Sequence, residues 1–452
     1  MNKIFKLSVV CTLLFSCTKI EKEIQYRPYQ SNDIVISKDT TINDVWLIPN
    51  TTIVRFETSG HISGNGTIRG GIIQAPLTQN LFDTTIKLEN ITLYDHDFSV
   101  NWFGANSAVS DNYNSIQKSI NACIDNNLKN CFIPTGVYNY SKSLKIQKIY
   151  KSAYVGVAIR LYGESQYWDN KTTLNYTGLT GFALGVQVGK GTEIDHLKLS
   201  GKFVAPSTRD SVYYNTPQTS FGTNANSYGL IIDYDGSKGQ SGSTGIKVHD
   251  MWVTNFGICY SVSPSAQTAN ADILLFENIR CGEARIGFQS NQAQEKGNVI
   301  RGIYSWDRIH TLISIGQSGK YQAGNYTIDG GNIAGGCVQL FDIRESGWYP
   351  SSISNLFSES MARVGSIQCG DSKNQLPTKI SSCTFHFAYK AQAGVQNLLY
   401  CNSTFIQFED CLFRYYGDYS PMKMTGWATF ENCFFSCGIA GIINVNHGFI
   451  FK

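Results

Sequence analysis

The stretch TFENCFF (429–435) repeats, with small changes, QFEDCLF (407–413) and KISSCTF (379–385). From its second position, each has an apolar residue, a polar residue, a small polar residue, Cys, a variable residue and Phe. A short phrase repeated along a chain indicates one structural unit built several times. The sequence therefore predicts a repeat architecture for this part of the chain.

Looser copies extend the repeat toward the N-terminus. They are SISNLFS (352–358), TIDGGNI (327–333), IRGIYS (300–305), LFENIRC (275–281) and KVHDMWV (247–253). Fainter copies are EIDHLKL (193–199), KLENITL (87–93) and TIRGGII (67–73). The copies align on a small or turn-forming residue: Asp250, Asn278, Gly302, Gly330, Asn355, Ser382, Asp410 and Asn432. The steps between these residues are 28, 24, 28, 25, 27, 28 and 22, a mean of 26.

Each copy alternates apolar and polar residues, which is typical of a strand with one buried face. Its central Asn, Asp or Gly favours a sharp bend, because these residues adopt left-handed backbone angles at little cost. A period of about 26 residues is typical of one coil of a parallel β-solenoid, in which coils stack about 4.8 Å apart. We therefore predict an all-β fold, a right-handed, single-stranded parallel β-helix.

Stacked coils place equivalent residues in columns, and the alignment predicts two apolar ones. The first comprises Val248, Phe276, Ile300, Ile328, Ile353, Ile380, Phe408 and Phe430. The second comprises Met251, Ile279, Ile303, Gly331, Leu356, Cys383, Cys411 and Cys433. The cysteines of the second column suit a buried stack of free thiols, since free Cys behaves as a small apolar residue. A disulfide is the alternative for Cys123 and Cys131, where it would join the ends of a short helix and loop.

The stretch NWFGANSAVSDNYNSIQKSINACIDNNLKNCFIPTGVYNYSKSLKI (101–146) is the most specific in the chain. Ile116, Ile120, Ile124 and Leu128 form a helical stripe, with Ser110 or Asp111 as the expected N-cap. The order Phe-Gly-Ala, amphipathic helix, Pro-x-Gly-x-Tyr and strand resembles the first segment of the pectate-lyase-superfamily right-handed β-helix. The resemblance is close over 101–146 and elsewhere rests on the repeat period. It implies that the helix caps the N-terminal end of the β-helix.

The resembling family contains polysaccharide lyases, glycoside hydrolases, epimerases and phage tailspikes, so the resemblance implies a fold more than a reaction. Its members usually carry Gly-Asp-Gly and an Asp pair after Phe-Gly-Ala. Here that place reads Asn106-Ser107-Ala108-Val109-Ser110-Asp111-Asn112, in which only Asp111 remains. These residues suit a turn and a helix cap.

The N-terminal residues MNKIFKLSVVCTLLFSC (1–17) have a basic start and an apolar run too short to span a bilayer. They resemble a bacterial lipoprotein signal, which implies lipidation of Cys17; the alternative is an ordinary secretory signal. We expect a polar tether at 18–31, a small β-rich leader at 32–100 and the β-helix at 101–452. The protein is then exported and lipid-anchored at the bacterial outer membrane or cell surface, and contacts the membrane only through that lipid.

Composition and motif content argue against several functions. Charged residues make up 16 % of the chain and the net charge is +3, which argues against a nucleic-acid partner. Phosphate-binding Gly-rich loops, His-Glu-x-x-His and Gly-x-Ser-x-Gly are absent from the sequence. His249, His310 and His386 have no metal-ligand spacing, so no metal site is predicted. Trp252, Trp306 and Trp427 lie in or beside repeat strands, where packing is the expected role.

Candidate catalytic residues come from counting five positions beyond each bend. This places Glu283 and Asp307 in one column on adjacent coils, flanked by Arg285 and Arg308. Two close carboxylates push one pKa upward, as glycoside hydrolysis requires. A lyase would instead use Arg285 or Arg308 as base, with a carboxylate-bound cation such as Ca²⁺; otherwise no cofactor is expected. The alternative is a pair of surface carboxylates bridged to neighbouring arginines.

A second candidate cluster is the stretch LFDIRESGWYP (340–350). Asp342 and Arg344 alternate with apolar residues and so are expected to point outward together, beside Glu345. Trp348 and Tyr349 follow, where aromatic rings suit stacking on sugars. The alternative is an exposed salt-bridge patch with a packed loop.

These features predict a protein that acts on a polysaccharide along the β-helix wall, as a polysaccharide lyase or a glycoside hydrolase. The alternatives are a non-catalytic glycan-binding adhesin and a tailspike-like structural protein. The C-terminal GIAGIINVNHGFIFK (438–452) lacks an evident helical cap. An uncovered coil end exposes strand edges, so self-association, as a homotrimer, is expected there.

Overall fold

The structure is a computed structural model. It describes residues 33–166, 171–207, 211–235, 242–263, 271–291, 296–316, 325–345, 351–369, 378–387, 399–415, 423–436, 444–446 and 449–451. Cys17, Trp348 and Tyr349 lie outside these ranges, as does the side chain of Glu345.

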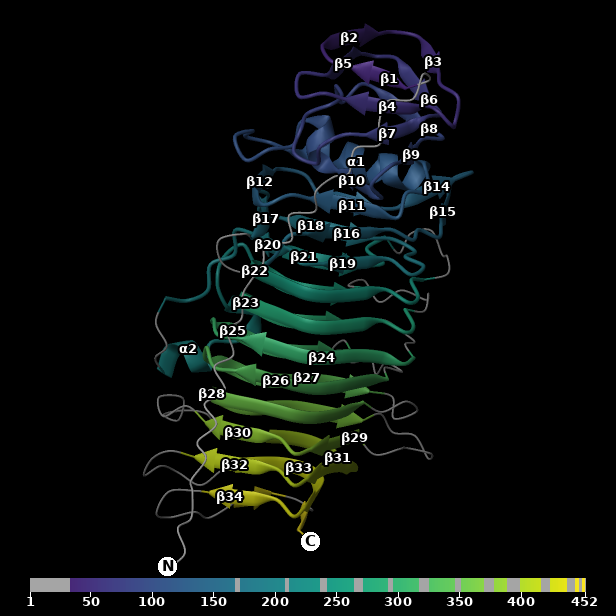
Figure 1. The fold of residues 1–452 in the computed structure, drawn as a ribbon. Coiled ribbons are helices and arrows are strands. Elements are labelled where there is room, and N and C mark those ends of the chain that lie inside the picture. Colours follow the sequence, from purple (N-terminus) through teal and green to yellow (C-terminus); the bar gives the residue numbers. More distant parts are fainter. Residues whose placement is uncertain are drawn as a thin grey trace, which may run out of the picture.

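The main body is an elongated stack of coils, in which one 25-stranded sheet runs in parallel register from β10 to β36 (Figure 1). Each coil contributes a strand segment to three faces, which we call faces A, B and C in chain order. Strands pair with the equivalent segment one coil away, so the backbone hydrogen bonds run along the axis of the stack. The all-β parallel β-helix predicted from the repeat is confirmed.

Face A begins with four separate strands: β10 (Asp97–Ser99), β11 (Asn130–Ile133), β16 (Arg160–Gly163) and β19 (Glu193–Asp195). It continues in the first parts of β22 (Lys247–Val262), β23 (Leu275–Ser290), β24 (Asn298–Ser305), β26 (Tyr326–Ile333) and β28 (Ser352–Cys369). It ends in β29 (Thr378–Ser381), the last parts of β31 (Leu399–Glu409) and β33 (Lys423–Glu431), and β36 (Phe449–Phe451).

Faces B and C share the long strands with face A. Face B adds β12 (Gly136–Tyr140), β17 (Thr172–Tyr176), β20 (Lys198–Ser200), β30 (Thr384–Phe387), β32 (Leu412–Tyr415) and β34 (Phe434–Ser436). Face C adds β13 (Leu144–Ile146), β18 (Gly181–Val186), β21 (Ser227–Ile232), β25 (Ile309–Ile315), β27 (Cys337–Glu345) and β35 (Asn444–Asn446). A separate antiparallel hairpin joins β14 (Lys148–Tyr150) to β15 (Ala153–Val155).

The first apolar column is confirmed at every step. Strand register pairs Val248 with Phe276 and continues, coil by coil, to Phe408 opposite Phe430. All of its members are buried. The rings of Phe408 and Phe430 stack with centroids 4.9 Å apart and planes inclined by 8°. The repeated phrase therefore recurs because each coil must present the same inward face to its neighbours.

The bends between faces A and B have the predicted left-handed backbone. All the aligned residues have positive φ, from 49° at Asn278 to 76° at Gly330. Asn90 and His196, in the fainter copies, share this conformation. A left-handed residue at each corner turns the strand toward the next face, as the small polar residues predict.

The cysteines of the second column form the predicted thiol stack. Cys383 and Cys411 are buried, Cys433 is half-buried, and each of the three thiols donates to a backbone carbonyl of its own coil. Cys123 and Cys131 are both buried and both free, so the alternative of a disulfide between them is not what the structure has.

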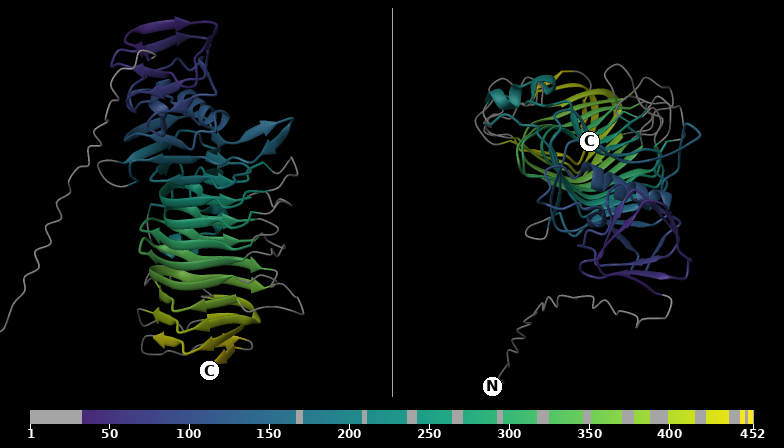
Figure 2. Two further views of the ribbon diagram at one scale, coloured as in Figure 1. Left: turned by 45° about the vertical axis from the view of Figure 1, so that its right-hand side comes forward. Right: turned by 90° about the horizontal axis from the view of Figure 1, so that it is seen from above.

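The leader forms smaller coils at the N-terminal end of the stack (Figure 2). Its strands are β1 (Ile34–Ile36), β2 (Asp39–Ile42), β3 (Val45–Leu47), β4 (Ile53–Phe56), β5 (His61–Gly64), β6 (Thr67–Arg69), β7 (Ile72–Gln74), β8 (Lys87–Glu89) and β9 (Thr92–Leu93). Register pairs Ile34, Val54, Ile73 and Leu93 in series, so the steps are 20, 19 and 20 residues. One hydrophobic core nevertheless runs without a break from Ile36 to Phe430.

The helix α1 (Tyr113–Asp125) lies between the leader and the first coils, after the 3-10 helix η1 (Val100–Phe103) (Figure 1). Gln117 exchanges hydrogen bonds with the backbone of Lys145 in β13. Asn126, just past the helix, donates to the carbonyl of Leu88 in the leader. The expected N-cap is corrected: the cap is Asn112, while Asp111 accepts from the backbone N–H of Tyr113.

The segment between β20 and β21, which we call the arm (201–207 and 211–226), crosses the outside of face C. It contains α2 (Ser211–Asn215) and the 3-10 helix η2 (Gln218–Ser220), and Figure 1 shows α2 beside coils well beyond β21. Phe203, Tyr213 and Phe221 of the arm form a second apolar cluster with Val338 of β27 and Ala362 of β28. Within the described ranges, no helix is long and apolar enough to cross a bilayer.

Candidate functional site

The corner between faces B and C carries most of the predicted catalytic residues. Asn255 and Glu283 turn this corner with positive φ, at 63° and 46°. Ala284 then pairs with Ile309 on the next coil, and its N–H donates to the carbonyl of Arg308. Glu283 therefore lies opposite Arg308 on the next coil. The count of five residues beyond each bend, which placed Asp307 in the column of Glu283, is wrong by one residue. The cause is one extra residue in the loop after β24.

Glu283 and Arg308 form an ion pair. Arg308 Nε donates to Glu283 Oε1 at 2.9 Å, and both side chains are largely buried. Arg308 Nη1 also donates to the carbonyl of Pro206 at 2.6 Å. This guanidinium thus ties the corner to the arm.

Asp307 lies on the same corner, over Gly282. A Cβ built at Gly282 would approach Asp307 Oδ2 to 2.1 Å, so only glycine leaves room for this carboxylate. Burial lowers the pKa of Lys198 below its usual range, with Lys171 and Arg280 acting in the same direction and Asp307 opposing them. The lysine and the carboxylate therefore belong to one electrostatic cluster.

A stack of cations and indole rings follows face B up to this corner. Register aligns Lys198, Trp252 and Arg280 on successive coils. Lys198 Nζ lies 3.8 Å from the Trp252 ring centre, and Arg280 Cζ lies 4.3 Å from it on the other coil. Arg280 Cζ is also 3.3 Å from the Trp306 ring centre. Cation–π contacts of this kind orient a cation and an aromatic face together.

Trp306 presents this stack to solvent, since 48 % of its surface is exposed while Arg280 is buried. We call Lys198, Trp252, Arg280, Glu283, Trp306, Asp307 and Arg308 the corner site. The packing role expected for Trp252 and Trp306 is thus incomplete, because both rings face cations on the outer wall. Lys198 and Arg280 were missed, because the repeat alignment alone assigns no role to outward positions.

Arg285 lies beyond the corner, on face C. Burial lowers its pKa, with Tyr228 opposing, and its Nε is buried without a hydrogen-bond partner in the described ranges. His310 lies nearby beneath the arm, where burial and then Arg363 hold its pKa at about 3. Its Nε2–H donates to the carbonyl of Thr216 at 3.0 Å. This part of face C is cationic but covered.

The second predicted cluster lies at the far end of β27 from the corner site. Arg344 Nη2 and Asp342 Oδ1 are 3.6 Å apart, and both side chains are about three-quarters buried. Burial raises the pKa of Asp342, and Arg344 opposes this. The structure thus pairs these two residues with each other. Sugar binding at Asp342, Arg344 and Glu345 stays a prediction.

A further polar cluster was missed on face A. Register places Asp195 opposite His249, and the neighbouring corner positions are His196 and Asp250. The interpretation of His249 as isolated is therefore wrong. Burial lowers the pKa of His249, but hydrogen bonds to Asp250 and Glu193 raise it above its usual range overall. Superposing EIDHLKL on KVHDMWV already brings these residues together.

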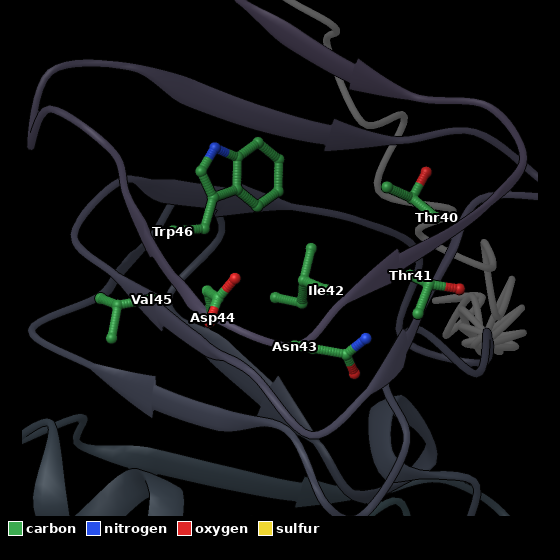
Figure 3. Close-up of a pocket in the computed structure, with 7 residues that line it drawn as sticks. All are labelled: Thr40, Thr41, Ile42, Asn43, Asp44, Val45 and Trp46. Atoms are coloured by element: carbon green, nitrogen blue, oxygen red, sulfur yellow. The ribbon is translucent and has the colours of Figure 1, made fainter.

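A shallow pocket of about 340 Å³ lies in the leader, on the segment Thr40–Trp46 (Figure 3). Its lining comes from one short segment and includes a single carboxylate, Asp44, and a single indole, Trp46. It is remote in the chain from the corner site and gathers no catalytic group. We therefore assign no function to it.

Comparison with known proteins adds little. Neither a scan against protein-family models nor a search of curated proteins gave a match. Among solved structures, the chain is similar to one described as "Crystal structure of Agl-KA catalytic domain", with a TM-score of 0.44 and 13 % identity. The alignment covers 79 % of this chain and 68 % of that one. A likeness this weak carries no argument about function.

Proposed function

We propose that this protein binds an acidic polysaccharide across the corner site and cleaves it by β-elimination. The observation that carries the proposal is the exposed Trp306 ring with Arg280 packed on it. Aromatic faces stack on sugar rings, and a guanidinium pairs with the carboxylate of a uronic acid. The corner supplies an exposed indole ring and, packed against it, a guanidinium that is largely covered.

Charge favours an acidic ligand. The corner site has the cations Lys198, Arg280 and Arg308 against the carboxylates Glu283 and Asp307, so its formal charge is 3 − 2 = +1. The whole chain carries only +3. The corner site thus carries a net positive charge beside an open aromatic ring.

Elimination needs a base that removes the proton next to the uronate carboxyl group. Lys198 suits this role, because its lowered pKa raises the fraction of neutral amine. Its nitrogen takes the C5 proton, the electron pair forms the C4–C5 double bond, and the C4–O bond breaks. The leaving oxygen is then protonated by solvent. Arg280 stabilises the charge that develops on the uronate carboxyl group.

Hydrolysis fits the corner less well, because it needs one carboxyl group free to donate a proton and a second free to attack or activate water. Glu283 is instead held by Arg308 at 2.9 Å. Ca²⁺, the cofactor expected for a lyase, also fits poorly, since Ca²⁺ needs several oxygen ligands and cations outnumber the two carboxylates here. We derive no step through Ca²⁺.

Binding without cleavage is the second candidate. It is favoured by the same Glu283–Arg308 pair, which holds the Glu283 carboxylate in an ion pair and leaves the exposed Trp306 ring as a binding surface. The pectate-lyase-superfamily resemblance is compatible with both candidates.

The test is incubation with a panel of acidic and neutral glycans, followed by glycan-array binding, ultraviolet absorbance of unsaturated uronates and product mass. We expect Trp306→Ala to weaken binding about 5- to 150-fold, because truncating an aromatic anchor at a binding site costs about 1–3 kcal/mol. Trp427→Ala is the matched control, since Trp427 is also 48 % exposed on the outer wall. Lys198→Ala should abolish elimination while acidic glycans still bind.

Each alternative predicts a different result. Glycan binding with neither new reducing ends nor unsaturated products identifies an adhesin. New reducing ends without unsaturation, lost in Glu283→Gln and Asp307→Asn, identify a hydrolase and contradict the role of Lys198. Equal binding by Trp306→Ala and Trp427→Ala contradicts the corner site itself.

We also propose that the chain is exported and lipidated at Cys17, so that the corner site meets extracellular polysaccharide. Fatty-acid labelling that persists in Cys17→Ser contradicts this anchor. A homotrimer stays our proposal for the C-terminal end, and a monomeric mass by light scattering contradicts it.

A further inference from the structure

The side chains around His249 on face A form a second polar site, separate from the corner site. They come from β19 and β22, which are adjacent coils, and from the corners that follow them. Asp195 of β19 stands opposite His249 of β22, and His196 and Asp250 continue each coil. Two imidazoles and two carboxylates thus meet across one step of the stack.

His249 is held by carboxylates at both ring nitrogens. Its Nδ1 is 2.8 Å from Asp250 Oδ2, and its Nε2 is 2.7 Å from Glu193 Oε1. Asp195 Oδ2 is 3.9 Å from the same Nε2. Asp250 is in turn oriented by Asn278, whose Nδ2 donates to Asp250 Oδ1 at 2.5 Å.

His196 completes the arrangement from the other side of Asp195. Its Nδ1 is 2.5 Å from Asp195 Oδ1. One ligand atom from each of Asp195, His196 and His249 lies within 4.8 Å of the other two. Ligands of a tetrahedral Zn²⁺ at about 2.1 Å lie about 3.4 Å apart, so side-chain adjustments of about 1 Å bring all three onto one ion.

We infer that Asp195, His196 and His249 bind a divalent transition-metal ion of the Zn²⁺ type, with its remaining coordination position open to water. Mixed imidazole and carboxylate donors suit Zn²⁺, whereas Ca²⁺ and Mg²⁺ prefer oxygen alone. Asp250 acts as a positioning residue. A metal-bound histidine almost always donates its other N–H to a carboxylate, and Asp250 stands ready to accept from Nδ1 of His249.

The local charge leaves room for a cation. Glu193, Asp195 and Asp250 contribute −3, while Arg160 and Lys247 contribute +2, so the site is −1 with neutral imidazoles. Arg160 donates to Asp195 Oδ2 and Oδ1, at 2.8 Å each, and His196 lies on Oδ1. A carboxylate has about four lone-pair positions, so one on Oδ2 remains for the metal.

Such an ion would join the coil of β19 to the coil of β22. The chain between them carries the arm, which in turn covers face C and contacts Arg308 of the corner site. The metal would therefore stabilise the coil from which the arm departs. It has no direct contact with the corner site, so its loss and a failure of the proposed polysaccharide activity are distinguishable.

The test is titration of the chelator-treated protein with Co²⁺ and Zn²⁺. We expect one ion per chain, a visible absorption spectrum typical of four- or five-coordinate Co²⁺, and a rise of the thermal midpoint that EDTA reverses. His249→Gln and His196→Gln should each weaken Co²⁺ binding at least tenfold. His386→Gln is the matched control, since it removes a partly exposed imidazole on a distant coil, and should bind as the wild type does.

Asn278→Gly tests the positioning role without removing a ligand, because glycine keeps the left-handed backbone of this corner, and it should weaken Co²⁺ binding several-fold while circular dichroism stays unchanged. The inference is overturned if the wild type shows neither a Co²⁺ spectrum nor a metal-dependent midpoint. It is equally overturned if His249→Gln binds Co²⁺ as tightly as His386→Gln, or if Ca²⁺ binds as tightly as Zn²⁺.

Discussion

Individual side chains at the corners direct the path of the chain. Ser382, Asp410 and Asn432 each adopt φ near 50°, although none is glycine. Their side chains need no contact with the core, so sequence reasoning recognises them from residue type and spacing alone. The corner site is different, because what Lys198 and Arg280 do depends on rings in other coils.

His310 is the residue that most clearly makes stability depend on pH. Its pKa of about 3 in the folded chain lies below the usual value because the arm and face C bury it, and Arg363 and Arg285 repel its protonated form. The imidazole of His310 therefore binds a proton near pH 6.5 in the unfolded chain, but only near pH 3 in the folded chain. Stability is intact above pH 6.5 and falls as the pH decreases toward 3.

We expect the wild type to lose about 1.4 kcal/mol per pH unit below 6.5 through this one group. His310→Gln should lose correspondingly less between pH 6.5 and 4.5, whatever its stability at neutral pH. Urea unfolding of both proteins across this range measures the difference. If the free energy of unfolding falls equally with pH in the two proteins, the buried imidazole of His310 is not the cause.

Strands are stabilised by columns in which equivalent residues of successive coils pack on one another. The stacked phenylalanines near the C-terminal end show how much free energy one such contact contributes. Phe408→Ala removes a buried ring that stacks on Phe430, and should cost about 3–5 kcal/mol. Phe434→Ala, in the same part of the stack but 65 % exposed, should change stability by less than about 0.5 kcal/mol. Urea unfolding of the two variants makes the comparison, and similar losses would refute the column as the source of stability.

At the level of elements, the sequence predicted the strands and their apolar register but not the outer wall. A fixed offset of five residues failed at Asp307, because one extra residue after β24 shifts Arg308 into the position beside Glu283. Inward positions are constrained by every coil, whereas corner lengths vary freely. Offsets counted across a corner therefore accumulate errors.

The arm could not be placed from sequence for a related reason. It lacks the repeat, so nothing in its pattern indicates that Phe203 and Phe221 pack on β27 and β28. The contact from Pro206 to Arg308 spans 102 positions. The His249 cluster, by contrast, could have been predicted from the sequence, because its residues occupy aligned positions of two copies of the repeat.

Considered as a whole, the molecule has one core, although its coils change from about 20 to about 26 residues between leader and main body. The helix α1 is hydrogen-bonded to both parts. The leader is therefore expected to unfold together with the first coils. It should not behave as a detachable domain.

Limited proteolysis tests this expectation. A protease site inserted in the β14–β15 hairpin at Lys151–Ser152, a surface turn, should be cut without loss of the folded core. Deleting residues 33–96 should lower the thermal midpoint and increase binding of an apolar dye, because it uncovers α1 and the first coils. Recovery of the leader as a stable, folded fragment would contradict a shared core.

The ladder of hydrogen bonds parallel to the stack axis has a mechanical consequence. Tension applied between the two ends of the chain peels strands apart one rung at a time, so the load never falls on many bonds together. In the lipid-anchored, polysaccharide-binding protein that we propose, drag on the bound polymer acts across the side wall and loads several coils together. The corner site lies on the flank, on the coils of β20 to β24 and away from either end of the sheet, so strands on both sides of it share that load.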